Sequence, residues 1–216
     1  MPPEDLRGRN PAAVLAALFI VAVGPVLEPL GALLAIGWAR LTGTPLRELG
    51  FVRPRSWAAT IALGIAFGVA FKLVLKAVVL PLLGAPTINA AYHHLAGNTA
   101  ALPGMLWLVI VGAGFGEETV FRGFLFERSR AWFGAGKGVL AATVLVSSAW
   151  FAAVHIPDQG LFGAVQAGIV GLVFGTIFAV TRKLWPLIVA HAAFDVAAVF
   201  IIYLDLEERV AHFLFR

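Results

Sequence analysis

Two adjacent glutamates and an arginine lie inside an apolar stretch of the chain, where charged side chains are rare. In the segment GEETVFR they are Glu117, Glu118 and Arg122. An ionised side chain at mid-membrane costs about 2.5–3.5 kcal/mol on the insertion scale, so carboxylates placed there indicate a functional site. Residues four apart are neighbours on a helix, so Glu118 and Arg122 can form an ion pair. Glu117 is then free to act as a general base.

Two later apolar stretches add imidazoles and a third carboxylate. His155 ends the segment AWFAAVH, and His191 and Asp195 stand four apart in HAAFD, which puts them on the same helix face. Each of these groups alone is more typical of a structural contact, such as a salt bridge between helices or a histidine at a helix end. Because three separate stretches each supply such groups, the sequence predicts one buried site for acid–base chemistry.

The composition predicts an integral membrane protein. Of the 216 residues, 60% are hydrophobic and 13% are charged, whereas about a quarter of the residues are charged in soluble domains. The formal net charge of +4 does not indicate nucleic-acid binding, because the basic residues lie between the apolar runs and form no continuous patch. The chain has no cysteine, which excludes disulfides and a thiolate nucleophile.

Long apolar runs predict an all-α fold, a polytopic transmembrane helical bundle of about six spans with the site in a mid-membrane cavity. The spans are expected at residues 11–39, 57–83, 101–126, 138–155, 161–180 and 185–204. They divide the chain into N-terminal spans with an interfacial loop (1–100), a catalytic core (101–204) and a C-terminal tail (205–216). Three glycines just before the glutamates would allow close helix approach there.

Between the spans, lysine and arginine occur only in alternate loops, the first, third and fifth. The positive-inside rule places these loops in the cytoplasm and both chain ends outside. Arg7 and Arg9 argue against that placement of the N-terminus, and a different count of the first span would move it inside. We expect the cavity to open toward the cytoplasmic side. The first loop, LTGTPLRELGFVRPRS, is either an interfacial segment on the membrane surface or a plain linker.

Three polar residues in the first two spans are interpreted as structural. Lys76 can reach the membrane surface along its aliphatic chain, and Lys72 can pair with another buried group such as Glu28.

Three motifs in order make the chain resemble the CPBP intramembrane proteases. This family includes type II CAAX prenyl endopeptidases as well as bacteriocin-processing and abortive-infection proteins. The motifs are EExxxR from Glu117, FxxxH from Phe151 to His155, and HxxxN/D from His191 to Asp195. Each motif alone is weak, but their order and their separate apolar runs make the set specific. The resemblance covers residues 101–200 and implies an endopeptidase that cleaves a membrane-associated or lipid-linked polypeptide.

The resemblance also implies roles for the motif residues. Glu117 would be the general base and His155 its partner in activating a water for attack on a peptide carbonyl. His191 and Asp195 would stabilise the oxyanion, while the second glutamate and the arginine of the first motif would support the site or hold substrate. Because an oxyanion stabiliser must donate a hydrogen bond, Asp195 has either to be protonated or to orient His191.

The sequence leaves the metal question open. Glu117, His155 and His191 could hold Zn²⁺ with an open position for water, and a metal-free glutamate mechanism fits the same residues. The chain has no HExxH motif, and ligands on three separate runs have no diagnostic spacing.

The alternative to a protease is a membrane transport or binding protein that uses the buried Glu, His and Asp residues as an ion or proton site. The runs show no inverted repeat of the kind common in transporters. Expected partners are a peptide or protein substrate at the membrane and the lipid bilayer, with no nucleic acid. The sequence carries no signal for an oligomeric state. The expected location is the plasma (inner) membrane of a prokaryote, as a multi-pass protein.

Overall fold

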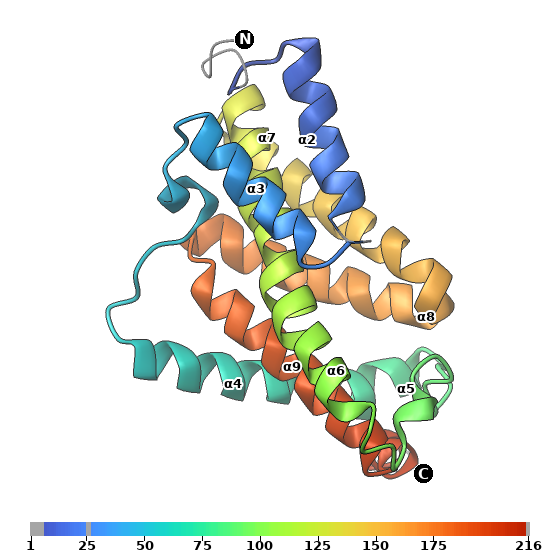
Figure 1. Cartoon of the computed structure of the whole chain (residues 1–216). Helices are drawn as coiled ribbons and strands as arrows, with labels where there is room; N and C mark the ends of the chain where they lie inside the picture. The colour runs from blue at the N-terminus through green and yellow to red at the C-terminus, as the bar shows by residue number, and fades with distance from the viewer. Residues whose placement is uncertain (1–6, 25–26, 215–216) are drawn as a thin grey trace.

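The chain folds into helices that pack around one long central helix. The computed structural model describes residues 7–24 and 27–214, in which all the regular secondary structure is helical, as predicted. In chain order the helices are α2 (Pro11–Val23), α3 (Leu30–Leu41), η1 (Leu46–Leu49), α4 (Trp57–Val74), η2 (Leu75–Val79), α5 (Leu80–Leu82), η3 (His93–Leu95), α6 (Leu102–Trp107), η4 (Leu108–Phe124), α7 (Leu125–Phe133), α8 (Lys137–Thr181), α9 (Trp185–Tyr203) and α10 (Glu207–Ala211). Figure 1 shows α6, η4 and α7 running end to end through the middle of the molecule.

Four helical stretches in the described part of the chain are long and apolar enough to cross a membrane. They are Trp57–Leu82, Leu102–Phe133, Lys137–Thr181 and Trp185–Tyr203. Trp57–Leu82, Leu102–Phe133 and Trp185–Tyr203 correspond to the second, third and sixth expected spans. Helix α8 (Lys137–Thr181) contains both the fourth and the fifth expected spans. The expectation of about six spans stays a prediction.

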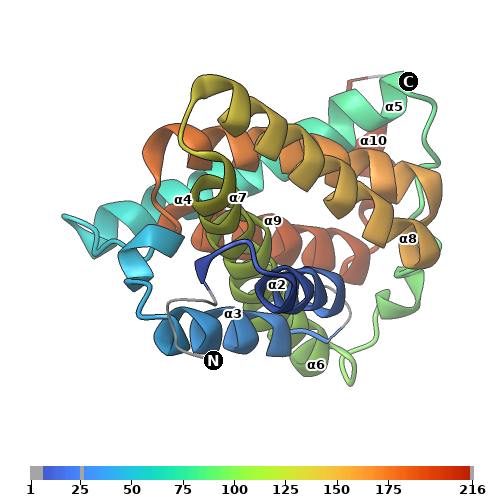
Figure 2. The same cartoon turned by 90° about the horizontal axis from the view of Figure 1, so that it is seen from above.

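Helix α8 is a hairpin whose two arms are antiparallel. Gly160 has φ 65° and ψ −168°, a conformation that favours glycine, and the chain reverses there. A Cβ added at Gly171 would lie 2.9 Å from Cα of Ser148, and one at Gly175 would lie 3.4 Å from Cγ1 of Val144. The arms therefore pack closely through small residues, and Figure 2 shows them side by side. The first arm continues beyond residue 155, where the fourth span was expected to end, as far as the reversal at Gly160.

The first expected span, residues 11–39, is wrong as a single crossing. Helices α2 and α3 have 13 and 12 residues, which makes each about 20 Å long, against about 30 Å for the hydrocarbon core. They form a short antiparallel pair (Figure 1). Hydropathy missed the break because apolar residues continue through the turn, although Gly24 and Pro29 flank it.

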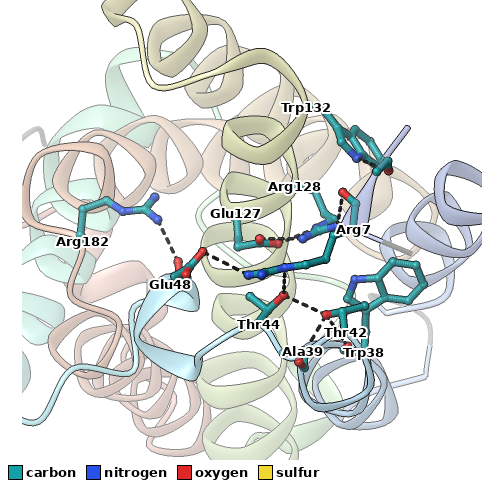
Figure 3. A network of polar contacts seen from close by, with 11 residues as sticks. Arg7, Trp38, Ala39, Thr42, Thr44, Glu48, Glu127, Arg128, Trp132 and Arg182 are labelled. Atoms are coloured by element: carbon teal, nitrogen blue, oxygen red, sulfur yellow. Dashed lines mark hydrogen bonds and ion pairs between the residues drawn. The ribbon is translucent and has the colours of Figure 1, made fainter. Parts of the chain in front are cut away.

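The basic loops meet at one end of the molecule, together with the N-terminal segment (Figure 3). Arg7 Nη2 lies 3.8 Å from Glu48 Oε2 in the first loop, and Arg182 Nη2 donates to the Glu48 carbonyl at 2.8 Å. Trp132 of α7 donates from Nε1 to the carbonyl of Gly8 at 3.0 Å. This clustering agrees with one shared side for the three basic loops. The expected placement of the N-terminus on the opposite side is wrong for the described residues.

The first basic loop is packed into the protein. Leu49 of η1 is fully buried, and the Gly50 carbonyl accepts a hydrogen bond from the backbone N–H of Leu184 at 2.9 Å. The loop therefore packs against the helices and is not a plain linker. Its expected position on the membrane surface stays a prediction.

The second loop is held at the opposite end by a buried carboxylate. Glu207 of α10 accepts a hydrogen bond from the backbone N–H of Asn89 at 2.8 Å, and its other oxygen lies 3.2 Å from His93 Nδ1. Lys76 Nζ lies 3.4 Å from Glu207 Oε1. The expectation that Lys76 reaches the membrane surface is therefore wrong, because this carboxylate offers it a partner inside the protein.

Glycines bring the backbones of α4 and α9 into contact. A Cβ added at Gly64 would lie 2.7 Å from Cγ1 of Val189, and one at Gly68 would collide with the backbone carbonyl of Ala190. Helix α9 carries one of the three motifs, so this contact fixes how deep that motif lies beside α4.

Replacing Gly68 by alanine is expected to lower stability by about 1–3 kcal/mol, because the added methyl group overlaps α9 backbone. Thermal unfolding in detergent, followed by circular dichroism, measures this. The matched control is Gly104→Ala, since a Cβ at that helical glycine meets nothing within 4 Å. Equal unfolding temperatures for the two variants would contradict the close contact.

Candidate active site

A buried chain of charged groups joins η4 to α9. Arg122 Nη1 donates to Glu118 Oε1 at 2.9 Å, and His191 Nδ1 lies 2.7 Å from the same oxygen. The side chains of Arg122 and Glu118 are 0% exposed. The ion pair predicted from the four-residue spacing is therefore present, and it also holds the histidine of the third motif.

Aromatic rings surround the guanidinium of Arg122. Its Cζ atom lies 4.7 Å from the ring centroid of Phe151, 5.8 Å from that of Phe174 and 5.9 Å from that of Phe121. Within the described residues, its Nε and Nη2 atoms have no hydrogen-bond partner. Cation–π attraction from the ring faces offsets part of the desolvation of this charge.

Glu118 determines which nitrogen of His191 carries a proton. A carboxylate paired with arginine only accepts hydrogen bonds, so His191 donates from Nδ1. Its Nε2 atom then lies 3.6 Å from Glu117 Oε2 and 3.4 Å from Asp195 Oδ2. The free nitrogen of His191 is therefore between the two carboxylates of the predicted site.

His155 lies in the first arm of α8, beside the same aromatic core. Its Nδ1 atom is 2.7 Å from the carbonyl oxygen of Phe151 on its own helix. The ring of Phe151 has its centroid 4.6 Å from that of His155 and 6.0 Å from that of His191. Among the described residues no hydrogen bond or ion pair links His155 directly to Glu117, although both line one cavity.

The cavity has a volume of about 370 Å³ and is lined by residues of all three motifs. Glu117, His155, His191 and Asp195 are all in its wall. Its loop residues, such as Tyr92, come from the second loop, and none of the described lining residues comes from the basic loops. The cavity thus extends away from the basic end, so the expected opening toward the side of the basic loops is wrong.

Tyr92 brings a hydroxyl group to this wall from outside the membrane spans. Burial raises the pKa of Tyr92 above its usual value, so the phenol stays protonated at neutral pH. Its oxygen accepts a hydrogen bond from Gln159 Nε2 at 3.3 Å, and its own proton stays available to the cavity.

Glu28 is a site residue that sequence reasoning missed. Its carboxyl group lies close enough to that of Glu117 for the two to interact, and both residues line the cavity. Gly112 makes room for it, because a Cβ there would lie 2.5 Å from Glu28 Oε2. A lone acid between apolar helices was its only sequence signal. The expected pair of Lys72 with Glu28 is wrong, since Lys72 donates to Gln166 Oε1 at 3.1 Å.

The candidate zinc ligands do not form a three-ligand site as they are arranged here. Among the described residues no group of three or more His, Cys, Asp or Glu side chains is placed to hold a metal ion. The Nδ1 atoms of His155 and His191 already have partners in Phe151 and Glu118.

Residues 99–197 match the family model described as type II CAAX prenyl endopeptidase Rce1-like. No curated protein and no solved structure matches the chain. The matched region contains the three motifs, whereas Glu28 and Lys72 lie outside it and line the same cavity.

The Glu118→Gln variant is expected to lose about 3–5 kcal/mol of stability, because it leaves the buried charge of Arg122 unpaired. Denaturant unfolding in micelles measures this loss. Glu48→Gln is the matched control, since its ion pair with Arg7 is 41% exposed on both sides and such pairs contribute about 0–1 kcal/mol. A loss for Glu118→Gln no larger than the control's would contradict the role given to the buried pair.

Because the chain has no cysteine, single engineered cysteines can report which face the cavity reaches. We expect an impermeant thiol reagent to label Tyr92→Cys and Arg47→Cys from opposite sides of sealed vesicles, since Tyr92 lines the cavity and Arg47 lies in the first basic loop. Labelling of both from the same side would contradict the observed direction of the cavity.

Proposed function

We propose that the chain is a multi-pass intramembrane endopeptidase of the CAAX type, because residues 99–197 match the type II CAAX prenyl endopeptidase Rce1-like family, and that Glu117 and His155 activate its hydrolytic water. The proposed substrate is a membrane-associated or lipid-linked polypeptide. The observation that carries the proposal is one cavity of about 370 Å³ whose wall includes Glu117, His155, His191 and Asp195. The proposed location is the plasma membrane of a prokaryote.

The proposed reaction begins with a water between Glu117 and His155. Glu117 Oε2 has no hydrogen-bond partner among the described residues, so it can accept a water proton. His155 donates from Nδ1 to a carbonyl oxygen that can only accept, which leaves Nε2 of the neutral ring as a second acceptor. The water oxygen attacks the peptide carbonyl carbon, its proton passes to Glu117, and Glu117 gives that proton to the leaving amine.

The oxyanion that forms in this attack needs a hydrogen-bond donor. His191 Nε2, held by Glu118 through the other ring nitrogen, supplies this donor when the imidazole is protonated. An ionised Asp195 cannot donate, so its proposed role is to orient His191, whose Nε2 atom is 3.4 Å away. Glu118 and Arg122 support the site and do not touch the reacting atoms.

The proposed mechanism uses Glu117 and His155 without a metal, and a chelator tests it against a zinc-dependent mechanism. A chelator should therefore leave cleavage unchanged. Loss of cleavage on chelation, with recovery on addition of zinc, would replace this mechanism by a metal-dependent one.

Glu117→Gln is expected to lower cleavage about 10²-fold to 10⁴-fold, because the variant keeps the shape of the side chain but cannot take a proton. The measurement compares purified wild type and variant on a prenylated CAAX peptide and on a peptide library, with and without chelator. Glu48→Gln, at the far basic end, is the control and should cleave as the wild type does.

Cleavage that survives in Glu117→Gln would contradict the role of this glutamate. A folded wild type that cleaves nothing but moves or binds a solute would instead favour a transport or binding function.

A further inference from the structure

Lys72 is a buried cation in the cavity wall that the proposed reaction does not use. It comes from α4 and is 7% exposed. Among the described residues that line the cavity it is the only lysine or arginine. A buried charge without a role in catalysis needs either a structural partner or a ligand.

The structural partners of Lys72 leave part of its bonding capacity unused. Its ammonium donates to Gln166 Oε1 at 3.1 Å and lies 4.8 Å from the ring centroid of Phe194. An ammonium has three donors, and within the described chain Lys72 makes no ion pair with a carboxylate. Lys76, one helical turn later, is different because it pairs with Glu207 at 3.4 Å. Lys72 therefore keeps free donors and makes no direct ion pair among the described residues, so an anionic ligand can contact its ammonium.

Gln166 adds a second donor at the same place. An ammonium only donates, so Gln166 must present its amide oxygen to Lys72. Its NH₂ group is then left for the cavity, which Gln166 also lines. A carboxylate has two acceptor oxygens and can take one hydrogen bond from each side chain, in the charge-assisted form that is stronger than a neutral bond.

We propose that Lys72 and Gln166 form a binding site for a carboxylate of the peptide substrate, in the first place its C-terminal carboxylate. The inference rests on the proposed peptidase function. The acidic groups of the cavity wall support it, because they repel a carboxylate from the remainder of the cavity. They are Glu28, Glu117, Asp158 and Asp195. A bound peptide would thus enter with its carboxylate at Lys72 and its scissile bond at the motif residues.

The site lies at a usable distance from the proposed reaction centre. Phe194, beneath the Lys72 ammonium, is less than one helical turn from His191 on α9. Three residues along a helix rise about 4.5 Å, so a short stretch of bound peptide can reach from Lys72 to the motif histidine. The site therefore fits cleavage close to a carboxylate-bearing end.

The test measures binding of fluorescent peptides by anisotropy to the full-length Glu117→Gln protein in detergent, where hydrolysis is blocked. One sequence without acidic side chains is used in three forms, with a free C-terminal carboxylate, with a C-terminal amide, and with the amide preceded by glutamate. We expect the free carboxylate to bind about tenfold or more tightly than the amide, as a charge-assisted hydrogen bond implies. The glutamate form shows whether the bound group is a side-chain carboxylate or the C-terminal carboxylate.

Adding Lys72→Gln should abolish this preference, and Lys72→Arg should retain it. Lys76→Gln is the matched control, a second buried lysine of the same helical stretch, and should keep the preference. Equal binding of acid and amide by the Glu117→Gln protein, which needs no change at Lys72, would overturn the proposal. A preference that survives in Lys72→Gln would overturn it as well.

Failure of the proposed function is distinguishable from failure of this site. A wild type that cleaves no peptide while the carboxylate preference is present contradicts the peptidase proposal and leaves the carboxylate site supported. Glu117-dependent cleavage with no carboxylate preference contradicts the Lys72 site alone.

Discussion

The buried ion pair between Glu118 and Arg122 is the interaction on which the arrangement of the site depends. Both side chains are fully enclosed, so each charge needs the other. The rings of Phe121, Phe151 and Phe174 surround the guanidinium of Arg122. The ring of Phe151 also packs against that of His155. Glu118 in turn holds His191. One structural pair therefore orients groups from three helical segments around Glu117 without touching the reacting atoms itself.

Close backbone approach is the second constraint, and glycines satisfy it on two sides of η4. On one side a Cβ at Gly114 would lie 2.9 Å from Cβ of Ala192 on α9. On the other side Gly112 admits the carboxyl group of Glu28 from the turn before α3. The backbone of η4 has π-type hydrogen bonding, a form that is frequent at functional sites. Glu28 lies outside the matched family region, so the N-terminal part of the chain also contributes to the cavity wall.

The fold was predictable wherever a local pattern decides it. Apolar length alone gave the spans that begin near Trp57, Leu102 and Trp185, because a helix must satisfy its own backbone in lipid. The same reasoning failed for α2 and α3, since hydropathy averages over the turn at Gly24. It also misjudged Lys76, because the partner that keeps it inside, Glu207, is far away in the sequence.

The sequence by itself determined which residues could do chemistry and which of them pair along one helix. Glu118 with Arg122 and His191 with Asp195 are contacts four residues apart, set by the helical repeat. Only the tertiary structure decided that His191 meets Glu118, that Glu28 meets Glu117, and that Lys72 meets Gln166 instead of Glu28. Those contacts join different helices, and their geometry depends on how closely the glycines let the backbones approach, which no spacing along the chain encodes.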